Sequence, residues 1–135
     1  MRPSARAIIL QNNKVLLIHR FKEGSEYYVI PGGGIEQNET PEDTVKREIK
    51  EELSLDITID NKIGEYLNDN NPVIYYLVKS FSGEAKLGGP EKLRMQENVR
   101  NRYILEWVNL NDIDLINLVP EFIKGVIHEM SSKIV

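Results

Sequence analysis

The chain has 135 residues, carries a net charge of -4, and contains 41% hydrophobic and 28% charged residues. A chain of this length and balance is expected to fold rather than stay disordered, so we predict a single domain over residues 1–135. It contains no cysteine, which excludes disulfides, thiolate metal sites and a cysteine nucleophile. The negative charge argues against generic nucleic-acid binding, although a local cation or a metal can still recruit a nucleotide.

The expected location follows from what the sequence lacks. No apolar run approaches the ~20 residues of a transmembrane helix. Met1–Ser4 leads directly into a strand-like stretch, without the long apolar region of a secretory signal. The lack of cysteine fits a reducing compartment. We therefore expect a cytoplasmic protein that does not bind membranes.

Short runs rich in β-branched and aromatic residues predict strands along most of the chain. Asn12-Asn13 suits a tight hairpin between the first two runs, since asparagine tolerates a positive φ. Phe21–Glu26 is predicted to be a polar loop, and the glycines of Pro31–Gly34 are expected to break regular structure. In chain order the predicted strands are Ala5–Leu10, Lys14–Arg20, Tyr27–Ile30, Leu55–Ile59, Ile63–Leu67, Val73–Phe81 and Tyr103–Val108.

A helix is predicted from Thr40 or Pro41 to about Leu53. Thr40 is a good N-cap, Pro41 suits the first helical position, and Asp43 completes a capping box. Ser82–Asn101 is a long polar stretch with the character of a functional loop. A second, amphipathic helix is predicted over Val119–Ser132. Strands with helices in the middle and at the end indicate an α/β fold, with a mixed sheet between helices.

The first helix carries an unusual acidic face. Glu48, Glu51 and Glu52 are spaced i, i+3 and i+4, so Glu51 and Glu52 lie about 60° and about 40° to either side of Glu48. Carboxylates at this spacing repel one another, and a hard cation such as Mg²⁺ would compensate. Taken alone, such a face is more often simply solvated. Arg47, about 100° from Glu48, can turn back to hold a carboxylate in a bidentate pair.

Together with the preceding glycines, this face resembles the signature of the Nudix hydrolase family, in particular its MutT-like members. That signature is G-x5-E-x7-R-E-U-x-E-E-x-G-U, where U is a bulky aliphatic residue. One position departs, because Ser54 stands where the signature has its last glycine, at a helix end that glycine usually caps. The matching residues are Gly33, Glu39, Arg47, Glu48, Ile49, Glu51, Glu52 and Leu55.

The resemblance implies a Nudix-type α/β/α sandwich with a mixed β-sheet, and a site that uses Mg²⁺ or Mn²⁺. The implied metal ligands are the Gly32 carbonyl, Glu48, Glu51 and Glu52, and the implied catalytic residues are Glu39, Arg47, Glu51 and Glu52. Arg47 and Glu39 would pair and orient the other carboxylates. Family members often add a metal ligand or base from a later loop. Glu97 is the candidate here, beside the alternative of a solvated loop charge.

The implied function is metal-dependent hydrolysis of a phosphoanhydride bond in a nucleoside diphosphate linked to another group. A nucleoside triphosphate or dinucleotide pyrophosphohydrolase fits this description. An alternative is a Nudix-fold module that binds a nucleotide without turnover. Loss of a signature carboxylate would favour that alternative, and none is lost. A further alternative, a structural protein with an acidic helix, would not explain the glycines and Arg47 together. The identity of the substrate and the possibility of a homodimer stay open.

Other residues have competing roles. Tyr28 and Trp107 could stack on a base, although a core position is the better expectation for Trp107. Arg94, Arg100 and Arg102 could bind phosphate or simply be solvated. His19 and His128 are isolated in the sequence and are not expected to be catalytic.

Overall fold

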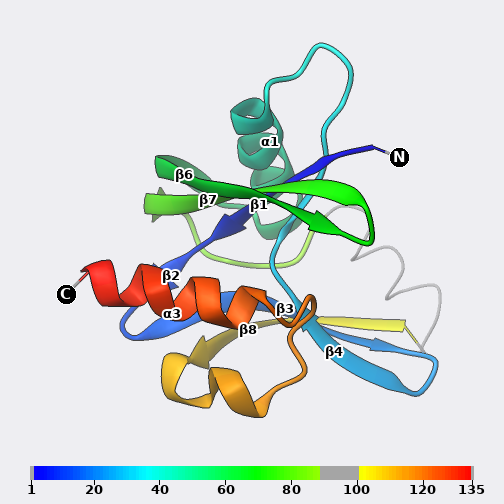
Figure 1. Cartoon of the computed structure of the whole chain (residues 1–135), viewed down its shortest axis with the longest axis vertical. Helices are drawn as coiled ribbons and strands as arrows, with labels where there is room; N and C mark the ends of the chain where they lie inside the picture. Colours follow the sequence, from blue (N-terminus) through cyan, green and yellow to red (C-terminus); the bar gives the residue numbers. More distant parts are fainter. Residues whose placement is uncertain (1, 89–100, 135) are drawn as a thin grey trace.

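The computed structural model describes residues 2–88 and 101–134. The described residues form two four-stranded sheets, one beside α1 at the top of Figure 1 and the other below α3 in that view. One is a mixed sheet of order β5-β1-β7-β6; the other is antiparallel, with β3 between β4 and β8 and with β2 pairing β3. The elements are β1 Ser4–Ile8, β2 Leu10–Gln11, β3 Lys14–Lys22, β4 Ser25–Val29, β5 Gly32–Gly34, α1 Pro41–Leu53, β6 Asp56–Asn68, β7 Asn71–Ser82, β8 Asn101–Asn109, the 3-10 helix η1 Leu110–Leu115, and α3 Ile123–Ile134.

The sheets form a middle layer that is apolar on both faces. Along β3, Val15 and Leu17 belong to one hydrophobic cluster while Leu16 and Ile18 belong to the other. Strand β7 alternates between the two clusters in the same way. One cluster contains residues of α3 and the other residues of α1, so each helix covers its own face. Strands buried on both faces need such runs of apolar residues, and the predicted α/β fold with a mixed sheet is confirmed.

The first predicted helix is confirmed in its bounds and caps. The Thr40 hydroxyl accepts a hydrogen bond from the Asp43 N–H, and the Asp43 carboxylate accepts one from the Thr40 N–H. At the other end Ser54 takes the left-handed conformation, with φ 61° and ψ 29°. Its N–H donates to the Lys50 carbonyl. The serine therefore fills the role for which the signature has glycine.

The turn at Asn12-Asn13 is confirmed, but the single strand predicted over Ala5–Leu10 is wrong: β1 pairs with β7 in the mixed sheet, and only β2 forms the hairpin with β3. Asn12 and Asn13 have φ of 52° and 62°, as a tight turn with two positive φ values requires. The prediction of a loop over Phe21–Glu26 is wrong, because Phe21 pairs with Glu26 and only Glu23-Gly24 forms the turn. The polar residues on either side of this turn therefore belong to β3 and β4, which pair with each other.

Two further expectations about strands are corrected. The glycines of Pro31–Gly34 do not end regular structure: Gly32–Gly34 forms β5, which pairs antiparallel with Ser4–Arg6 of β1. The separate strands expected at Leu55–Ile59 and Ile63–Leu67 are one strand, β6, whose register against β7 shifts at several points. Such irregularities accommodate the polar residues between the two apolar runs.

The C-terminal helix, α3, starts later than predicted. α3 begins at Ile123 rather than Val119, because the preceding residues pair with β4. The Val119 N–H donates to the Tyr28 carbonyl, and Leu118 forms a bridge with Tyr28. The 3-10 helix η1, capped by Asn109, was not predicted. In the described part of the chain, no helix has the length and apolarity needed to cross a membrane.

Candidate active site

Helix α1 divides its residues between the core and the acidic face. Val45, Ile49 and Leu53 are fully buried, and they fix the rotation of the helix on the mixed sheet. The three signature carboxylates consequently differ in exposure. The side chains of Glu51 and Glu48 are 51% and 15% exposed. Glu52 as a whole residue is only 6% exposed. The acidic face therefore runs from solvent toward the interior.

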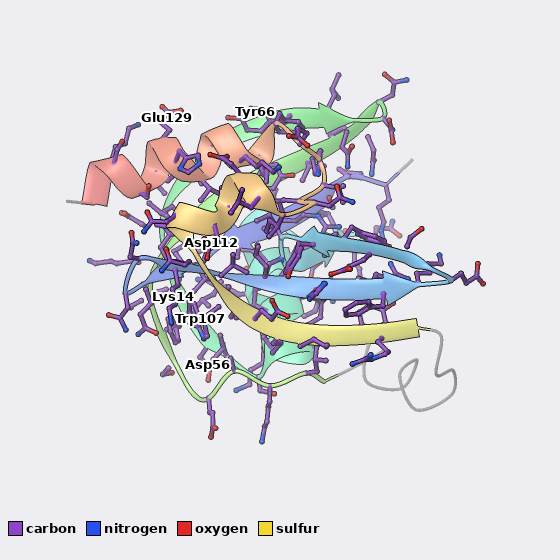
Figure 2. The ribbon with its side chains drawn as sticks, turned by 90° about the horizontal axis from the view of Figure 1, so that it is seen from below. Lys14, Asp56, Tyr66, Trp107, Asp112 and Glu129 are labelled. Atoms are coloured by element: carbon purple, nitrogen blue, oxygen red, sulfur yellow. The ribbon has the colours of Figure 1, made fainter. Side chains whose placement is uncertain are left out.

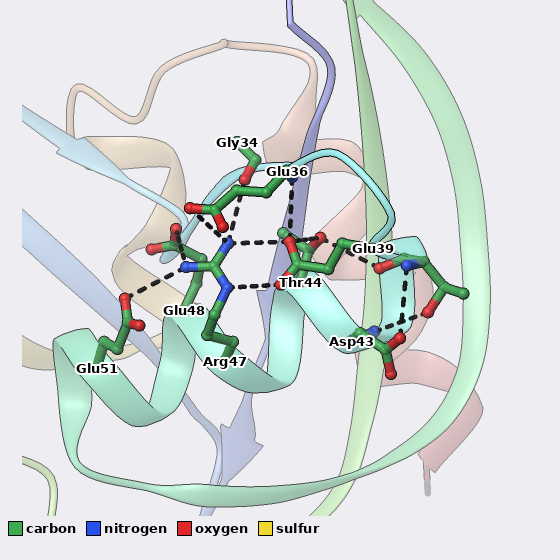
Figure 3. A network of polar contacts seen from close by, with 9 residues as sticks. Gly34, Glu36, Glu39, Asp43, Thr44, Arg47, Glu48 and Glu51 are labelled. Atoms are coloured by element: carbon green, nitrogen blue, oxygen red, sulfur yellow. Dashed lines mark hydrogen bonds and ion pairs between the residues drawn. The ribbon is translucent and has the colours of Figure 1, made fainter.

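Arg47 lies at the centre of a carboxylate network (Figure 3). Its Nε and Nη2 donate to the two oxygens of Glu39 at 2.6 and 3.0 Å, so the Arg47–Glu39 pair that the resemblance implied is bidentate. Its Nη1 donates to Glu48 Oε1 at 3.0 Å and to Glu51 Oε2 at 3.3 Å. Nη2 also reaches the Gly34 carbonyl at 3.4 Å. One guanidinium thus joins the loop before α1 to two of the signature carboxylates.

The same network explains the electrostatics of its members. Hydrogen bonds from Arg47, and then from the Thr44 hydroxyl, lower the pKa of Glu39 from 4.5 to about 2. Hydrogen bonding to Glu39 raises the pKa of Arg47 above its ordinary value. Both groups are therefore charged at neutral pH. The repulsion expected between Glu48 and Glu51 is offset in this structure by Arg47.

The glycine loop fits closely against β1 and α1. Gly32 has φ 151°, and a Cβ at that position would collide with the Ala5 carbonyl and Arg6. A Cβ on Gly33 would collide with the carboxylate of Glu48. The signature glycine is thus needed for contact rather than for flexibility, because it lets the Glu48 carboxylate lie against the loop backbone.

Glu52 and Gly32 open onto a common cleft with a volume of about 170 Å³. Its remaining wall comes from β1, β3, β4 and β8, so the antiparallel sheet contributes more of the lining than the signature helix does. The other lining residues are Arg6, Ile18, Arg20, Val29 and Tyr103.

The donor set suits a hard divalent cation. Glu48, Glu51 and Glu52 supply only oxygen, as Mg²⁺ prefers. The space that a Cβ of Gly33 would fill is used by the Glu48 carboxylate, which holds it at the loop. Among the described residues, no group of three or more His, Cys, Asp or Glu side chains is already gathered in a metal-binding arrangement. Arg47 lies between two of the carboxylates, and its Nη1 bonds compete with a metal for the same oxygens.

The other predicted site residues are only partly brought together. Glu97, Arg94 and Arg100 lie outside the described residues. Trp107, labelled in Figure 2, is partly buried rather than part of the core: it stacks on Phe81 and packs against the hydrophobic cluster that contains residues of α1. Arg102 lies over the Phe21 ring.

His19 and Tyr28 belong to a separate cluster in the antiparallel sheet. The His19 ring nitrogens contact Glu106 and Glu26 at 2.8 and 2.6 Å. Tyr28 stacks on His19 and donates to Glu106, and burial together with that hydrogen bond raises the pKa of Tyr28 to about 12. Leu17 and Glu106 are paired across β3 and β8, so the cluster lies on the face of the sheet that α3 covers.

Sequence reasoning missed the cleft residues Arg20 and Tyr103. They lie 83 positions apart in the sequence and meet only because β8 pairs with β3. No spacing rule along the chain connects them.

The NUDIX domain family model matches residues 1–130 of this chain. Because the match covers nearly the whole length, the chain belongs to that family, and the resemblance seen in the signature is confirmed.

Individual relatives agree with the family. The chain is 36% identical over 92 residues to an ADP-ribose pyrophosphatase of Methanocaldococcus jannaschii, covering 63% of this chain and 54% of that protein. It is 31% identical over 62 residues to an 8-oxo-dGTP diphosphatase of Proteus vulgaris, covering 43% and 55%. This chain thus spans about half the length of each. A MutT NUDIX hydrolase from Burkholderia pseudomallei has a similar structure, with a TM-score of 0.64, 26% identity, and coverage of 82% and 84%.

Proposed function

We propose that the chain is a metal-dependent hydrolase that cleaves a phosphoanhydride bond in a nucleoside diphosphate linked to another group. The observation that carries this proposal is the position of Glu52, a carboxylate only 6% exposed that lines the same cleft as Gly32. Carboxylate and carbonyl oxygens are the ligands that Mg²⁺ prefers, and Mg²⁺ commonly shares them with substrate phosphates. The position of Glu52 beside Gly32 therefore suits a divalent cation and the phosphates it accompanies.

The metal in this proposal is Mg²⁺ or Mn²⁺. Glu48, Glu51, Glu52 and the Gly32 carbonyl are the residues proposed to hold it. When bound, such a metal neutralises phosphate charge and lowers the pKa of water. Glu97 stays a candidate additional ligand, outside the described residues.

The chain's own residues supply positioning and proton transfer. Arg47, anchored by Glu39 at 2.6 Å, restrains Glu48 and Glu51 through a single nitrogen. We assign to this pair a positioning role. A carboxylate of Glu51 or Glu52 takes the proton of the attacking water as it adds to phosphorus, and the phosphoanhydride oxygen leaves. Most of the rate in such reactions comes from positioning and charge neutralisation.

The substrate class rests on the family and its named relatives. Those relatives are named for hydrolysis of ADP-ribose and of 8-oxo-dGTP. Both compounds are nucleoside diphosphates carrying a further group, so this common part is what we propose the site recognises. A cytoplasmic location and a possible homodimer complete the proposal.

The test is a substrate panel with Mg²⁺, with Mn²⁺ and with excess chelator. It should include ADP-ribose, 8-oxo-dGTP, ordinary nucleoside triphosphates, diadenosine polyphosphates, nucleotide sugars and capped RNA ends. Turnover should require metal and should drop by orders of magnitude in Glu52→Gln. A matched control is Glu129→Gln, which removes an exposed carboxylate of α3 on the opposite side of the sheets (Figure 2).

The outcomes separate the enzyme from the binding module. Full turnover in chelator, or near-normal turnover in Glu52→Gln, contradicts the metal mechanism. Thermal stabilisation by nucleotides without turnover of any panel member supports the non-catalytic alternative instead.

A further inference from the structure

Thr44 is a buried polar residue in the first turn of α1. The whole residue is 0% exposed, although it lies four positions before Glu48 and thus only about 40° away from it around the helix. Buried hydroxyl groups are almost always hydrogen-bonded. Two acceptors lie within reach of this one, the Glu39 carboxylate and the Thr40 carbonyl. Which of them takes the hydrogen decides whether Thr44 serves the helix alone or also the site.

The contacts of Thr44 favour Glu39 as the acceptor (Figure 3). Its Oγ1 lies 2.6 Å from Glu39 Oε1 and 3.1 Å from the Thr40 carbonyl oxygen. A hydroxyl has a single hydrogen to donate. The Thr40 carbonyl already accepts the Thr44 N–H at 3.0 Å, whereas a charged acceptor forms the shorter and stronger bond. The hydroxyl hydrogen is therefore assigned to Glu39.

The bond from Thr44 is one of four that the described residues form with the Glu39 carboxylate. Oε1 also accepts from the Glu36 N–H at 3.1 Å and from Arg47 Nη2 at 3.0 Å, and Oε2 accepts from Arg47 Nε at 2.6 Å. Glu36 belongs to the loop before α1, and Arg47 has a long side chain that is 26% exposed. A β-branched side chain such as threonine is short and stiff at χ1. Thr44 is therefore the rigid donor that fixes this carboxylate relative to α1.

The orientation of Glu39 matters because Arg47 is shared with the signature carboxylates. Glu39 occupies Nε and Nη2, so Arg47 reaches Glu48 and Glu51 through Nη1 alone. A guanidinium released by Glu39 could present two nitrogens to Glu48 and pair with it in the bidentate mode that suits a carboxylate. Both oxygens of Glu48 would then be engaged by Arg47 instead of a metal. A fixed Glu39 thus limits how strongly Arg47 competes for these ligands.

We propose that Thr44 is a positioning residue of the metal site, and that its hydroxyl acts through Glu39 and Arg47. The inference rests on the proposed function and extends it to a position that the signature leaves open, since Thr44 is one of the seven unspecified residues between Glu39 and Arg47. Thr44 keeps Glu39 turned toward Arg47. Glu48 and Glu51 then stay available to Mg²⁺ or Mn²⁺.

The affinity for Mn²⁺ alone, measured by isothermal titration, tests this role. Thr44→Val replaces the hydroxyl by a methyl group and keeps the branched shape of the side chain. The affinity should fall about fivefold, which corresponds to about 1 kcal/mol, the size of one hydrogen bond. Circular dichroism checks that the variant folds. Equal affinity in folded Thr44→Val and the wild type would overturn the proposal.

A second pair of variants isolates the hydroxyl in a smaller side chain. Thr44→Ser keeps the hydroxyl and loses a buried methyl group, whereas Thr44→Ala loses both. Because the lost methyl leaves a cavity, urea melts should show that Thr44→Ser is less stable than the wild type. Its Mn²⁺ affinity should nevertheless match that of the wild type, and that of Thr44→Ala should be about fivefold weaker.

This pair also distinguishes positioning from a purely structural role. A threonine with only a structural role would make the Mn²⁺ affinity of Thr44→Ser fall together with its stability, and that result would overturn the proposal. If Thr44→Val does not fold, the comparison of Thr44→Ser with Thr44→Ala decides the question.

Thr58→Val is the matched control. Thr58 is exposed and lies on β6, so this variant makes the same chemical change outside the set of donors to Glu39. Its Mn²⁺ affinity should equal that of the wild type. An equal loss in Thr58→Val and Thr44→Val would overturn the proposal, since the effect would not depend on Glu39.

The metal-free protein supplies an independent readout. Hydrogen bonds from Arg47 and then from Thr44 lower the pKa of Glu39 from 4.5 to about 2. The stability that this lowering contributes is complete above pH 4.5 and is lost as the pH falls toward 2. The stability of the wild type relative to Thr44→Val should therefore be greatest above pH 4.5 and should decrease as the pH falls. A difference independent of pH would mean that the hydroxyl donates to Thr40 instead, and would overturn the proposal.

The results separate this inference from the proposed function. If the hydroxyl changes Mn²⁺ affinity as expected but the wild type turns over no panel substrate, the hydrolase proposal fails and the role of Thr44 stands. If turnover requires metal but neither pair of variants differs in Mn²⁺ affinity, the inference is overturned and the hydrolase proposal stands. A wild type that binds no Mn²⁺ would overturn both.

Discussion

At the scale of single residues, Arg47 and Gly33 determine how the signature carboxylates lie. Arg47 is shared between Glu39 on one side and Glu48 and Glu51 on the other. Gly33 lets Glu48 approach the loop because it has no Cβ. The signature residues are thus related by contact and not only by spacing along the chain.

The Arg47–Glu39 pair predicts a pH dependence of stability. The pKa of Glu39 is lowered from 4.5 to about 2, so the folded state favours the charged form of this carboxylate. Its contribution to stability is complete above pH 4.5 and is lost as the pH falls from there toward 2. In thermal melts, Glu39→Gln should be less stable than the wild type at pH 7, and the difference should shrink as the pH falls through this window.

Glu36→Gln is the control for that experiment. Glu36 lies on the same loop, but its carboxylate is 3.8 Å from Arg47 and its side chain is 58% exposed. This substitution should have little effect at any pH. A difference between Glu39→Gln and the wild type that stays constant down to pH 2 would contradict the assignment.

Gly33→Ala should damage the site more than the fold. The added methyl meets the Glu48 carboxylate, and no positive φ is required at this position. We expect the metal affinity to fall by about 10–100-fold, the range seen when a group that orients a metal ligand is lost. Isothermal titration with Mn²⁺ measures this, and unchanged affinity would show that Glu48 can leave the loop at no cost.

At the scale of elements, α1 is fixed by its caps and an apolar stripe, and α3 by an apolar stripe. α1 has a complete capping box at Thr40 and a left-handed residue at Ser54. α3 presents Ile123, Ile127 and Met130 to the core. The opposite side of α3 is less constrained by packing. One substitution in α3 and one at the end of α1 test these assignments.

Gly125→Ala should stabilise the protein. Gly125 is exposed within α3, and a Cβ there meets nothing within 4 Å. Alanine in a helix interior is favoured over glycine by about 0.5–1 kcal/mol. Urea denaturation should show a gain of this size with unchanged turnover, which also makes this variant a control for Gly33→Ala. A loss of stability would mean that α3 is not helical at this position.

Ser54→Gly should be tolerated or slightly stabilising. The left-handed conformation costs a non-glycine residue roughly 1–2 kcal/mol, and the greater freedom of glycine in the unfolded chain offsets about 0.5–1 kcal/mol of the gain. The unfolding free energy should thus stay constant or rise slightly. A clear decrease in urea melts would contradict the φ of 61° at this residue.

At the scale of the whole molecule, the cleft is assembled from both sheets and from α1. Arg6 comes from the mixed sheet, Arg20 and Tyr103 from the antiparallel sheet, and Glu52 from the helix. A ligand in this cleft therefore binds only the folded chain. Such a ligand must stabilise the protein as a whole.

Mg²⁺ should therefore raise the melting temperature. At a concentration one hundred times its Kd, a ligand that binds only the folded state adds about 2.7 kcal/mol of stability. Calorimetric melts of the wild type with and without Mg²⁺ measure this gain. Glu52→Gln should show a smaller gain, and Glu129→Gln the full one. An equal gain in Glu52→Gln would place the metal elsewhere.

The sequence by itself determined the parts that depend on local spacing. Helix α1, its capping box and the Asn12-Asn13 turn could be read from neighbouring residues, whereas the pairing of Arg47 with Glu39 was implied by the family resemblance. Each of these is set by contacts within about one or two helical turns or by the φ preference of single residues. The family signature is local in the same sense, since it spans one loop and one helix.

Only the tertiary structure decided the remainder. Pairing with β1 turned Gly32–Gly34 into a strand, and pairing with β4 delayed the start of α3 to Ile123. The unequal burial of Glu51 and Glu52 depends on how α1 is rotated against the sheet. The three residues Tyr27, Arg20 and Tyr103 form one row only because three strands align. Hydrogen bonds between distant strands and the packing of a helix on a sheet have no signature in local spacing, and for this reason the cleft emerged only from the folded chain.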